Sequence, residues 1–310
     1  MVKSDLYEKL KIALLSVIPP GRIRFQEPMT LHTTFQIGGP ADFLVFPNSI
    51  HEVAAALDLA RQHGIAVTVL GNGSNVLVLD HGIRGMVIKF GNEMGYIRHN
   101  GNGTKVIAGA GALLSDVSSY AAQHHLSGLE FAIGIPGSIG GAVFMNAGAY
   151  EGEISQVVDA VTGVCPDGSI KRFTYAEIDF GYRHSIFQDN DCTICEVELA
   201  LCDGIHQDIH CKMGEYTAKR QTKQPIEMPS AGSTFKRPPG YFAGTLIEQA
   251  GLKGLQIGGA QVSLKHAGFV VNAGGATAQD VLALIKEIQH RVNDQFGVLL
   301  QPEVRIIGEA

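Results

Sequence analysis

The most informative stretch of this chain runs Gly134-Ile-Pro-Gly137-Ser-Ile-Gly140-Gly141-Ala-Val-Phe-Met-Asn146-Ala-Gly148-Ala-Tyr150. It is too apolar for a surface loop and too rich in glycine for a regular helix or strand. Another group must therefore come close to this backbone. A diphosphate fits this description, because a main chain without side chains can approach it and donate several N–H groups to it. A tightly packed crossing of chain segments is the alternative that these residues leave open.

A second glycine-rich loop, Gly71-Asn-Gly-Ser-Asn75, lies between two runs of β-branched residues. Such a loop can adopt positive φ angles and direct several N–H groups toward one anion. The two loops together predict a dinucleotide bound by backbone. The alternative for this loop is a hairpin turn, which Asn-Gly also favours.

The common nucleotide signatures are missing. Neither Gly71-x-Gly73 nor Gly109-x-Gly111 is completed by a third glycine at the required offset, and no Gly-x4-Gly-Lys-Ser/Thr occurs. A Rossmann domain and a P-loop are therefore disfavoured. A dinucleotide would be bound by the two separate loops instead.

The composition describes a soluble globular protein. The chain has 310 residues, 45% of them hydrophobic and 17% charged, which is enough for two or three domains. Its net charge of −6 argues against a general affinity for nucleic acid or for anionic membranes. A membrane span over 131–150 is disfavoured by its many glycines, and the amphipathic segment Met1–Ile18 predicts a helix instead of a signal peptide.

Hydrophobic periodicity and capping residues predict an α+β protein. Helices are expected at 1–18, 50–63, 112–125, 206–222 and 277–296. Strands are expected at 41–46, 65–70, 75–79, 85–90, 104–108, 157–164, 193–201, 268–272 and 302–307. Changes of composition divide the chain into 1–66, 67–202 and 203–310, with a final strand that can return to an earlier part.

The cysteines are Cys165, Cys192, Cys195, Cys202 and Cys211. An odd number in a large chain without a secretion signal suits a reducing compartment, so we expect free thiols. Cys192-Thr-Ile-Cys195 has the spacing of a metal or redox motif, but no second pair has that spacing. Its alternation predicts a strand, and no metal site is expected.

One segment carries the residue types of a catalytic site. In Gly232-Ser-Thr-Phe-Lys-Arg-Pro238 a hydroxyl lies between a glycine and a basic pair, an arrangement that suits a proton donor beside an anionic substrate. A plain turn is the alternative. Residues 219–237 also contain five basic side chains and a single acid, Glu227, which predicts a local basic pocket.

Several motifs in one order resemble the UDP-N-acetylenolpyruvoylglucosamine reductase family over residues 30 to 307. They are Thr33-Thr-Phe-Gln-Ile-Gly-Gly39, the two glycine loops, Gly181-Tyr-Arg-His-Ser-Ile-Phe187, Ala231–Pro238 and Gln301-Pro-Glu-Val-Arg305. The first 200 residues also resemble, more loosely, the flavin-binding superfamily of vanillyl-alcohol oxidase. The implied fold is an FAD-binding domain of this type, made of two αβ subdomains, followed by a C-terminal substrate-binding domain.

The resemblance implies a cytoplasmic flavoenzyme of bacterial peptidoglycan synthesis. Such an enzyme takes a hydride from NADPH onto FAD and passes it to the enolpyruvyl ether of UDP-N-acetylglucosamine, giving UDP-N-acetylmuramate. No histidine lies in either glycine loop, so we expect FAD to be noncovalent. The implied FAD-binding residues are Gly71, Asn72, Gly73, Ser74, Asn75, Gly134, Pro136, Gly137, Ser138, Gly140, Gly141, Asn146, Gly148 and Arg305.

Arg183, Ser233 and Glu303 match the catalytic positions of the family. Hydride addition at C3 of the enolpyruvyl group leaves negative charge on C2 and the carboxylate, so a cation and a hydrogen-bond donor should face it. Arg183 and Glu303 would stabilise the enolic intermediate, and Ser233 would deliver the proton to C2. Lys223 and Arg237 match positions that contact the substrate.

The chain departs from one branch of the family. Between Phe187 and Leu201 it lacks the longer tyrosine-bearing insertion that folds over the substrate, so it resembles the shorter, second type. Tyr150, Tyr182 and Tyr241 are candidates for closing the pocket. Another FAD-dependent oxidase or dehydrogenase of the superfamily, and a flavin-binding module without turnover, are the alternative functions.

Overall fold

The computed structural model describes residues 2–99 and 103–310. Met1, where the first predicted helix began, lies outside the described residues. The chain forms two compact units, and each is described below by itself. Unit 1 comprises 1–25, 43–72 and 85–218, and unit 2 comprises 26–42, 73–84 and 219–310.

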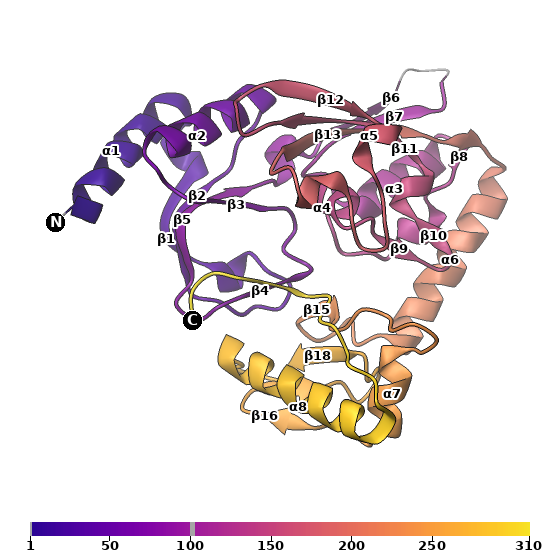
Figure 1. The fold of residues 1–310 in the computed structure, drawn as a ribbon. Coiled ribbons are helices and arrows are strands. Elements are labelled where there is room, and N and C mark those ends of the chain that lie inside the picture. The colour runs from indigo at the N-terminus through magenta and orange to yellow at the C-terminus, as the bar shows by residue number, and fades with distance from the viewer. Residues whose placement is uncertain (1, 100–102) are drawn as a thin grey trace. The chain divides into compact units, whose positions relative to one another are not determined.

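Unit 1 begins with α1 (Val2–Val17) and a sheet that lies largely in this unit, in the order β1-β2-β5-β3. Its strands are β1 (Ile23–Pro28), β2 (Pro40–Val45), β5 (Ile83–Lys89) and β3 (Val67–Leu70). Helix α2 (Ile50–Gln62) packs against α1 (Figure 1), and its first turn is capped by the Ser49 side chain, which accepts from the Glu52 N–H. This part supplies the strand ends that border the candidate site.

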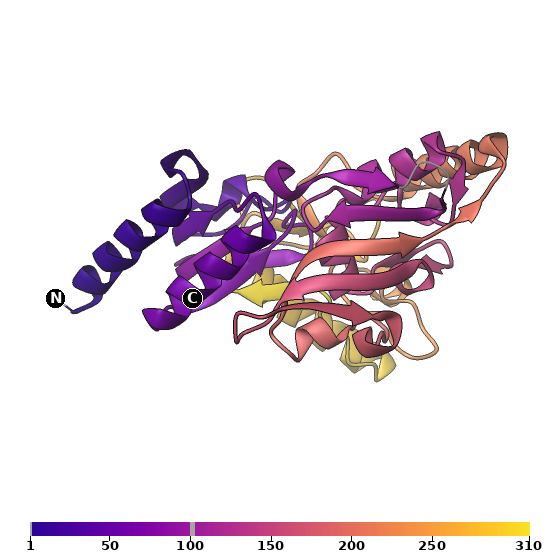
Figure 2. The same cartoon turned by 90° about the horizontal axis from the view of Figure 1, so that it is seen from above.

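The second sheet of unit 1 has the order β12-β11-β13-β7-β6. All neighbouring strands are antiparallel, and they lie side by side in Figure 2. The strands are β6 (Ile97–His99), β7 (Lys105–Gly109), β11 (Val158–Val164), β12 (Ile170–Thr174) and β13 (Thr193–Ala200). The alternating apolar residues of β11 and β13 are buried in the core of unit 1.

Short elements complete unit 1. They are α3 (Leu114–Gln123), β8 (Leu126–Ser127), α4 (Ile139–Phe144), β9 (Gly148–Ala149), β10 (Gly152–Glu153), α5 (Tyr175–Ile178), β14 (Cys202–Asp203) and α6 (His206–Lys223), whose last turn falls in unit 2. The glycine-rich stretch thus becomes a loop, the short helix α4 and a two-stranded ribbon.

Unit 2 is built on the antiparallel sheet β15-β18-β17-β16. Its strands are β15 (Ser230–Ser233), β18 (Phe269–Asn272), β17 (Ala260–Val262) and β16 (Gln256–Ile257). Helix α8 (Ala278–Phe296) packs against β16 and β17, and α7 (Ala243–Gln249) packs against α8 (Figure 1). The final strand β19 (Arg305–Ile307) pairs in parallel with β4 (Val76–Val78).

The core of unit 2 explains why two early segments belong to it. Phe35, Ile37 and Leu77 are fully buried in the same cluster as the apolar face of α8. Burial of side chains of this size contributes about 2 kcal/mol each. The division of the chain is therefore decided by contacts that join segments far apart in sequence.

The cysteine expectation is wrong for one pair, because Cys165 and Cys192 form a disulfide. Antiparallel pairing of β11 with β13 places Val164 opposite Thr193, so the next residues outward, Cys165 and Cys192, face each other with Cα atoms 4.1 Å apart. The sequence could not show this pairing, since 27 positions separate the two residues. Cys195, Cys202 and Cys211 are free.

The long helices and the strands predicted from periodicity are present within one to three residues at each end. The hairpin alternative for the 71–75 loop is wrong. In the described chain β3 pairs with β5 and β4 pairs with β19, so the two strands that flank the loop do not pair with each other. Other elements were missed because they carry little periodic signal, among them β1, β6, β12, β15, β16, β17 and α7.

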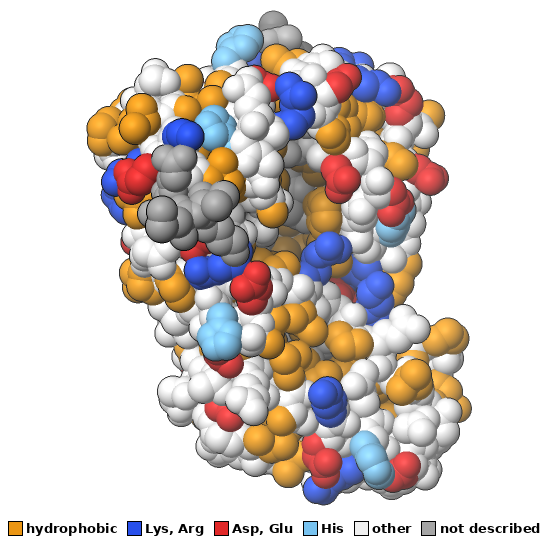
Figure 3. Space-filling view, turned by 60° about the vertical axis from the view of Figure 1, so that its left-hand side comes forward, with side chains coloured by type: hydrophobic (Ala, Val, Ile, Leu, Met, Phe, Trp, Pro, Cys, Tyr) orange, Lys and Arg blue, Asp and Glu red, His pale blue; other side chains and the backbone are white. Residues whose placement is uncertain are grey.

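The surface carries mixed charge. On the face drawn in Figure 3, acidic and basic side chains are interspersed with apolar ones.

Among the residues that the structure describes, no helix is long and apolar enough to cross a membrane.

The amino terminus of α8 is capped by an unusually distant residue. The Asp80 carboxylate accepts from the N–H groups of Ala278 and Gln279, at 2.8 and 3.0 Å, in addition to the capping box formed by Thr277 and Asp280. Carboxylates at this position also interact favourably with the helix dipole.

We expect Asp80→Ala to destabilise unit 2 by about 1–2 kcal/mol, because two backbone donors of α8 lose their acceptor. Urea unfolding and amide hydrogen exchange of the first turn of α8 measure the change. Asp294→Ala, on an exposed site of the same helix, is the control and should have little effect. Equal effects of the two substitutions would contradict the capping role.

Candidate active site

The start of the 71–75 loop meets the second glycine loop in unit 1. Asn72 donates from Nδ2 to the Pro136 carbonyl at 2.5 Å, and a Cβ on Gly71 would collide with the Ser138 Oγ. Segment 137–140 also runs beside 110–114 through backbone hydrogen bonds of 2.8–3.1 Å. The stretches predicted to hold one ligand are therefore neighbours.

Some glycines of these loops are required by packing alone. A Cβ on Gly140 would lie 2.9 Å from the Ala110 Cβ, and one on Gly148 would lie 2.6 Å from the Gly152 carbonyl oxygen. A Cβ on Gly141 would meet only the Ser138 Oγ, at 3.5 Å. The tight crossing therefore accounts for Gly140 and Gly148, whereas the backbone at Gly141 is less crowded.

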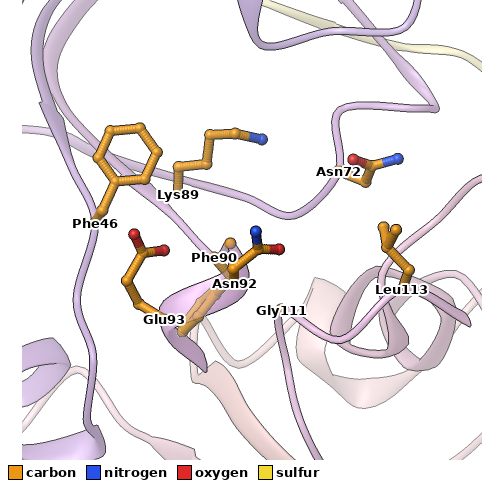
Figure 4. Close-up of a pocket in the computed structure, with 9 residues that line it drawn as sticks. Phe46, Asn72, Lys89, Phe90, Asn92, Glu93, Gly111 and Leu113 are labelled. Atoms are coloured by element: carbon orange, nitrogen blue, oxygen red, sulfur yellow. The ribbon is translucent and has the colours of Figure 1, made fainter. Parts of the chain in front are cut away.

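A cavity of about 340 Å³ lies in unit 1 beside the first loop (Figure 4). This volume is within the range of small-molecule sites. Of the residues predicted to bind the cofactor, Asn72 lines the cavity. The other lining residues are Phe46, Lys89, Phe90, Gly91, Asn92, Glu93, Gly111 and Leu113.

Lys89 is the basic group of this cavity. It is the last residue of β5, and its Nζ donates to the Gly71 carbonyl at 2.8 Å. Burial lowers the pKa of Lys89 to about 8. Figure 4 shows the amine directed toward the side of the cavity where Asn72 lies. An anionic ligand in the cavity would stabilise the protonated amine.

Phe46, Lys89 and Glu93 line the cavity but were not predicted as site residues from the sequence. Lys89 had a detectable signal, because it is a single cation inside the apolar run Met86-Val-Ile-Lys-Phe90. Such a charge on a buried strand requires a polar partner. Phe46 and Glu93 line the cavity because of the way the chain folds, and nothing in the residues around them in the sequence indicates this.

Arg183 lies in a tight turn of unit 1. Gly181 and His184 exchange backbone hydrogen bonds of 3.1 and 3.2 Å, and Arg183 adopts the left-handed region with φ 56°. Asn146 is buried, donates from Nδ2 to the Gly181 carbonyl at 2.9 Å and accepts from the Ser155 N–H. Asn146 was predicted to bind FAD. Its amide nitrogen and its amide oxygen both have partners within the protein, and through Gly181 the side chain supports the Arg183 turn.

Ser233 is exposed at the end of β15 in unit 2. Gly232 has φ +74°, and the register of β15 against β18 shifts between Ser230 and Ser233. Such a conformation is unfavourable for any residue with a Cβ. The bulge directs the Ser233 side chain to the surface, while the next residue, Thr234, is buried.

Thr234 connects Ser233 to Glu303. Its N–H donates to the Gly268 carbonyl at 2.9 Å, and its own carbonyl accepts from the Glu303 N–H at 2.8 Å. Asn75 donates from Nδ2 to the Glu303 carbonyl at 3.3 Å, and its carbonyl accepts from the Arg305 N–H at 3.0 Å. Asn75, Ser233, Glu303 and Arg305 are therefore adjacent in unit 2, although more than 200 positions separate the first from the last.

The two predicted substrate cations also lie in unit 2 and are exposed. Lys223 ends α6, and the Arg237 guanidinium lies over the Phe242 ring, 4.0 Å from its centroid. Among the described residues, no group of three or more His, Cys, Asp or Glu side chains is arranged to hold a metal ion.

Comparison with known proteins places this architecture in a family. The FAD-binding domain model matches residues 41–174, and the UDP-N-acetylenolpyruvoylglucosamine reductase C-terminal domain model matches 224–307. UDP-N-acetylenolpyruvoylglucosamine reductase 2 of Bacillus anthracis is 46% identical over 309 residues, which is 100% of this chain and 99% of that protein. The chain belongs to the UDP-N-acetylenolpyruvoylglucosamine reductase family. It is a flavin-dependent oxidoreductase.

Further relatives agree with this membership. The reductase of Clostridium perfringens (strain SM101 / Type A) is 51% identical over 286 residues, covering 92% of this chain and 93% of that protein. The crystal structure of the reductase from Thermus caldophilus matches with a TM-score of 0.78 and 37% identity, covering 92% of this chain and 97% of that chain.

A solved structure of low sequence identity shares the fold of part of this chain. The structure of 4-ethylphenol oxidase from Gulosibacter chungangensis matches with a TM-score of 0.50 over 64% of this chain and 43% of that chain. Its 16% identity shows a shared fold and nothing more. The expected α+β class, with an FAD-binding domain of the vanillyl-alcohol-oxidase type, is confirmed.

The residues of the cavity fit an FAD diphosphate, because the partly buried Lys89 amine and the Asn72 amide both line it. We expect Lys89→Met to weaken FAD binding about 10- to 100-fold, the loss associated with one charge-assisted hydrogen bond. Fluorescence titration of flavin-free protein measures the dissociation constant. Lys89→Gln keeps a donor for Gly71 without the charge, and Lys105→Met, at an exposed lysine, is the control. An unchanged constant in Lys89→Met would exclude this contact.

The same lysine predicts a pH dependence. An anion favours the protonated amine, so FAD affinity should be constant below the pKa of about 8 in the flavin-free protein. Above it, affinity should fall by up to about tenfold per pH unit, because the amine must then be protonated on binding. Titrations between about pH 6.5 and 9.5 measure this slope, which should disappear in Lys89→Met. A slope that persists in that variant would assign the effect to another group.

Proposed function

We propose that this protein reduces UDP-N-acetylglucosamine enolpyruvate to UDP-N-acetylmuramate with NADPH as the reductant, in cytoplasmic synthesis of peptidoglycan precursors. The observation that carries this proposal is the network of Asn75, Thr234 and Glu303, which holds the backbone of Glu303 against that of Thr234, the residue next to Ser233. Thr234 and Glu303 lie in the segment that matches the C-terminal domain of the family. FAD, when bound, supplies the two-electron redox chemistry of such a reduction.

Ser233 is the proposed proton donor to C2 of the substrate. A serine hydroxyl is a poor acid in water, so its contribution depends on distance to the carbanion and on exclusion of water. The bulge at Gly232 and the buried Thr234 restrict the backbone that carries it. This rigidity supports a positioned donor, because a mobile hydroxyl would lose most of its effective concentration.

Arg183 and Glu303 are proposed to stabilise the enolic intermediate. The guanidinium faces developing negative charge, and its position in the left-handed turn is supported by Asn146 through the Gly181 carbonyl. Glu303 acts as a hydrogen-bonding partner of the enol. Its backbone is bound on both sides, by Thr234 and Asn75.

Lys223 and Arg237 are proposed to bind the UDP diphosphate. Both are exposed cations in unit 2, and guanidinium and ammonium groups bind phosphate oxygens through charge-assisted hydrogen bonds. For FAD we propose backbone N–H groups of the two loops and Lys89, with noncovalent binding. Arg305, next to Asn75, remains a predicted cofactor contact.

The test of the function is anaerobic absorbance spectroscopy of the flavin-loaded protein. NADPH should bleach the flavin band, and UDP-N-acetylglucosamine enolpyruvate should then restore it. A band that returns only on admission of air would favour an oxidase of the same superfamily. Failure of the protein to bind FAD would contradict the proposal, because the reduction requires the flavin.

Ser233→Ala should leave flavin reduction by NADPH nearly unchanged and slow reoxidation by the substrate about 100- to 10,000-fold, the range of a lost general acid. Stopped-flow measurement of the two half-reactions separates these effects. Ser230→Ala, on the same strand, is the matched control. Equal losses in both half-reactions would exclude Ser233 as the proton donor.

A further inference from the structure

The disulfide between Cys165 and Cys192 has no part in the proposed reaction, yet it closes the segment that carries Arg183. Cys165 follows β11, and Cys192 precedes β13. Residues 166–191 between them contain β12, α5 and the Arg183 turn. Any change at the bridge therefore acts on both ends of this segment.

A continuous series of contacts leads from the bridge to Arg183. The Cys192 N–H donates to Asn190 Oδ1 at 2.9 Å, and the Asn190 N–H donates to the Ile186 carbonyl at 3.0 Å. Ile186 begins the 3₁₀ turn Ile186–Gln188. From its end, Gln188 Nε2 donates to the Arg183 carbonyl at 3.0 Å and to the Phe144 carbonyl at 2.8 Å.

We propose that Cys165 and Cys192 form a reversible thiol–disulfide site whose bridge orders residues 181–190 and thereby positions Arg183. The effect on turnover rests on the proposed function; the effect on the segment does not. Arg183 sits in a left-handed conformation that most residues avoid, so its position depends on the contacts around it.

The environment of the two sulfurs suits reversible exchange. Cys165 is half-buried and Cys192 is 8% exposed, so Cys165 is the sulfur open to a small reagent. Cys195 is fully buried, and burial raises its pKa to about 12, which disfavours the reactive thiolate. Cys195 therefore does not compete with the cross-strand pair for exchange, whereas Cys202 and Cys211 are exposed.

The oxidant is a small disulfide such as glutathione disulfide. The Cys165 thiolate attacks it and forms a mixed disulfide with release of one glutathione. Cys192 then attacks Cys165 Sγ, which releases the second glutathione. One S–S bond forms in the protein and one breaks in the reagent, and the two thiol protons end on two glutathione thiols.

The fold does not depend on the bridge. Strands β11 and β13 pair from Val158 to Val164, and their apolar side chains belong to the core of unit 1. Reduction should therefore loosen the segment between the cysteines while both strands remain paired. A change confined to that segment is what the proposal requires.

The first experiment maps the bridge in full-length, flavin-loaded Cys202→Ser/Cys211→Ser protein, which lacks the exposed thiols. The protein is equilibrated in glutathione buffers of increasing oxidising strength, alkylated and analysed by mass spectrometry. Cys165 and Cys192 should become protected together and be released together by dithiothreitol. Independent alkylation of the two residues under all conditions would overturn the proposal.

The second experiment compares oxidised and reduced protein by amide hydrogen exchange. Reduction should increase exchange at 181–190 severalfold and leave β11 and β13 unchanged. The rates of the two flavin half-reactions are measured on the same two forms. In the reduced protein, reoxidation of the flavin by substrate should be severalfold slower, whereas reduction of the flavin by NADPH should not change. Identical exchange in both forms, or an equal change throughout unit 1, would overturn the proposal.

Cys165→Ser/Cys192→Ser should behave like the reduced protein and no longer respond to dithiothreitol. If this variant fails to fold, the oxidised and reduced forms of the Cys202→Ser/Cys211→Ser protein still decide the question. Absence of substrate turnover in both forms would contradict the proposed function alone, since alkylation and hydrogen exchange report on the bridge independently. A residual response to dithiothreitol in the folded double variant would assign the effect to other thiols and overturn the proposal.

Discussion

Close contact between two backbone segments is the constraint on which unit 1 depends. Residues 137–140 bond to 110–114 through main-chain groups, which is possible because a glycine at 140 lets the chain approach Ala110. This contact places the short helix α4, and the hydrogen bond from Asn72 to Pro136 joins the start of the first loop to the second. Asn72, Gly111 and Leu113, which belong to these segments, form part of the wall of the cavity beside Lys89.

Unit 2 restricts the backbone around Ser233, the proposed proton donor, in a different way. A bulge at Gly232 exposes Ser233, and the neighbouring Thr234 is buried and bonded on both sides. The Thr234 carbonyl accepts a hydrogen bond from the Glu303 N–H. Asn75 in turn donates to the Glu303 carbonyl and accepts from the Arg305 N–H. Backbone hydrogen bonds, which need no particular side chain at most positions, thus bring together residues from three distant segments.

Much of the fold followed from local patterns. The capping box at Thr277 and the glycine at 297 bounded α8, and the alternation in 193–200 identified β13, because caps and periodicity act over a few residues. The proposed catalytic residues Arg183, Ser233 and Glu303 were predicted from their motifs. The cross-strand disulfide, the role of Asn146 beside the Arg183 turn and the lysine in the cavity were not, because each depends on a partner more than 15 positions away.

The sequence by itself determined the α+β class, the two glycine loops and the family resemblance, since these reside in residue type and spacing. Only the tertiary structure decided which glycines relieve backbone crowding and which cysteines pair. It also decided that 26–42 and 73–84 join the C-terminal unit. The physical reason is that burial and backbone pairing act between segments whose separation along the chain carries no information about their separation in space.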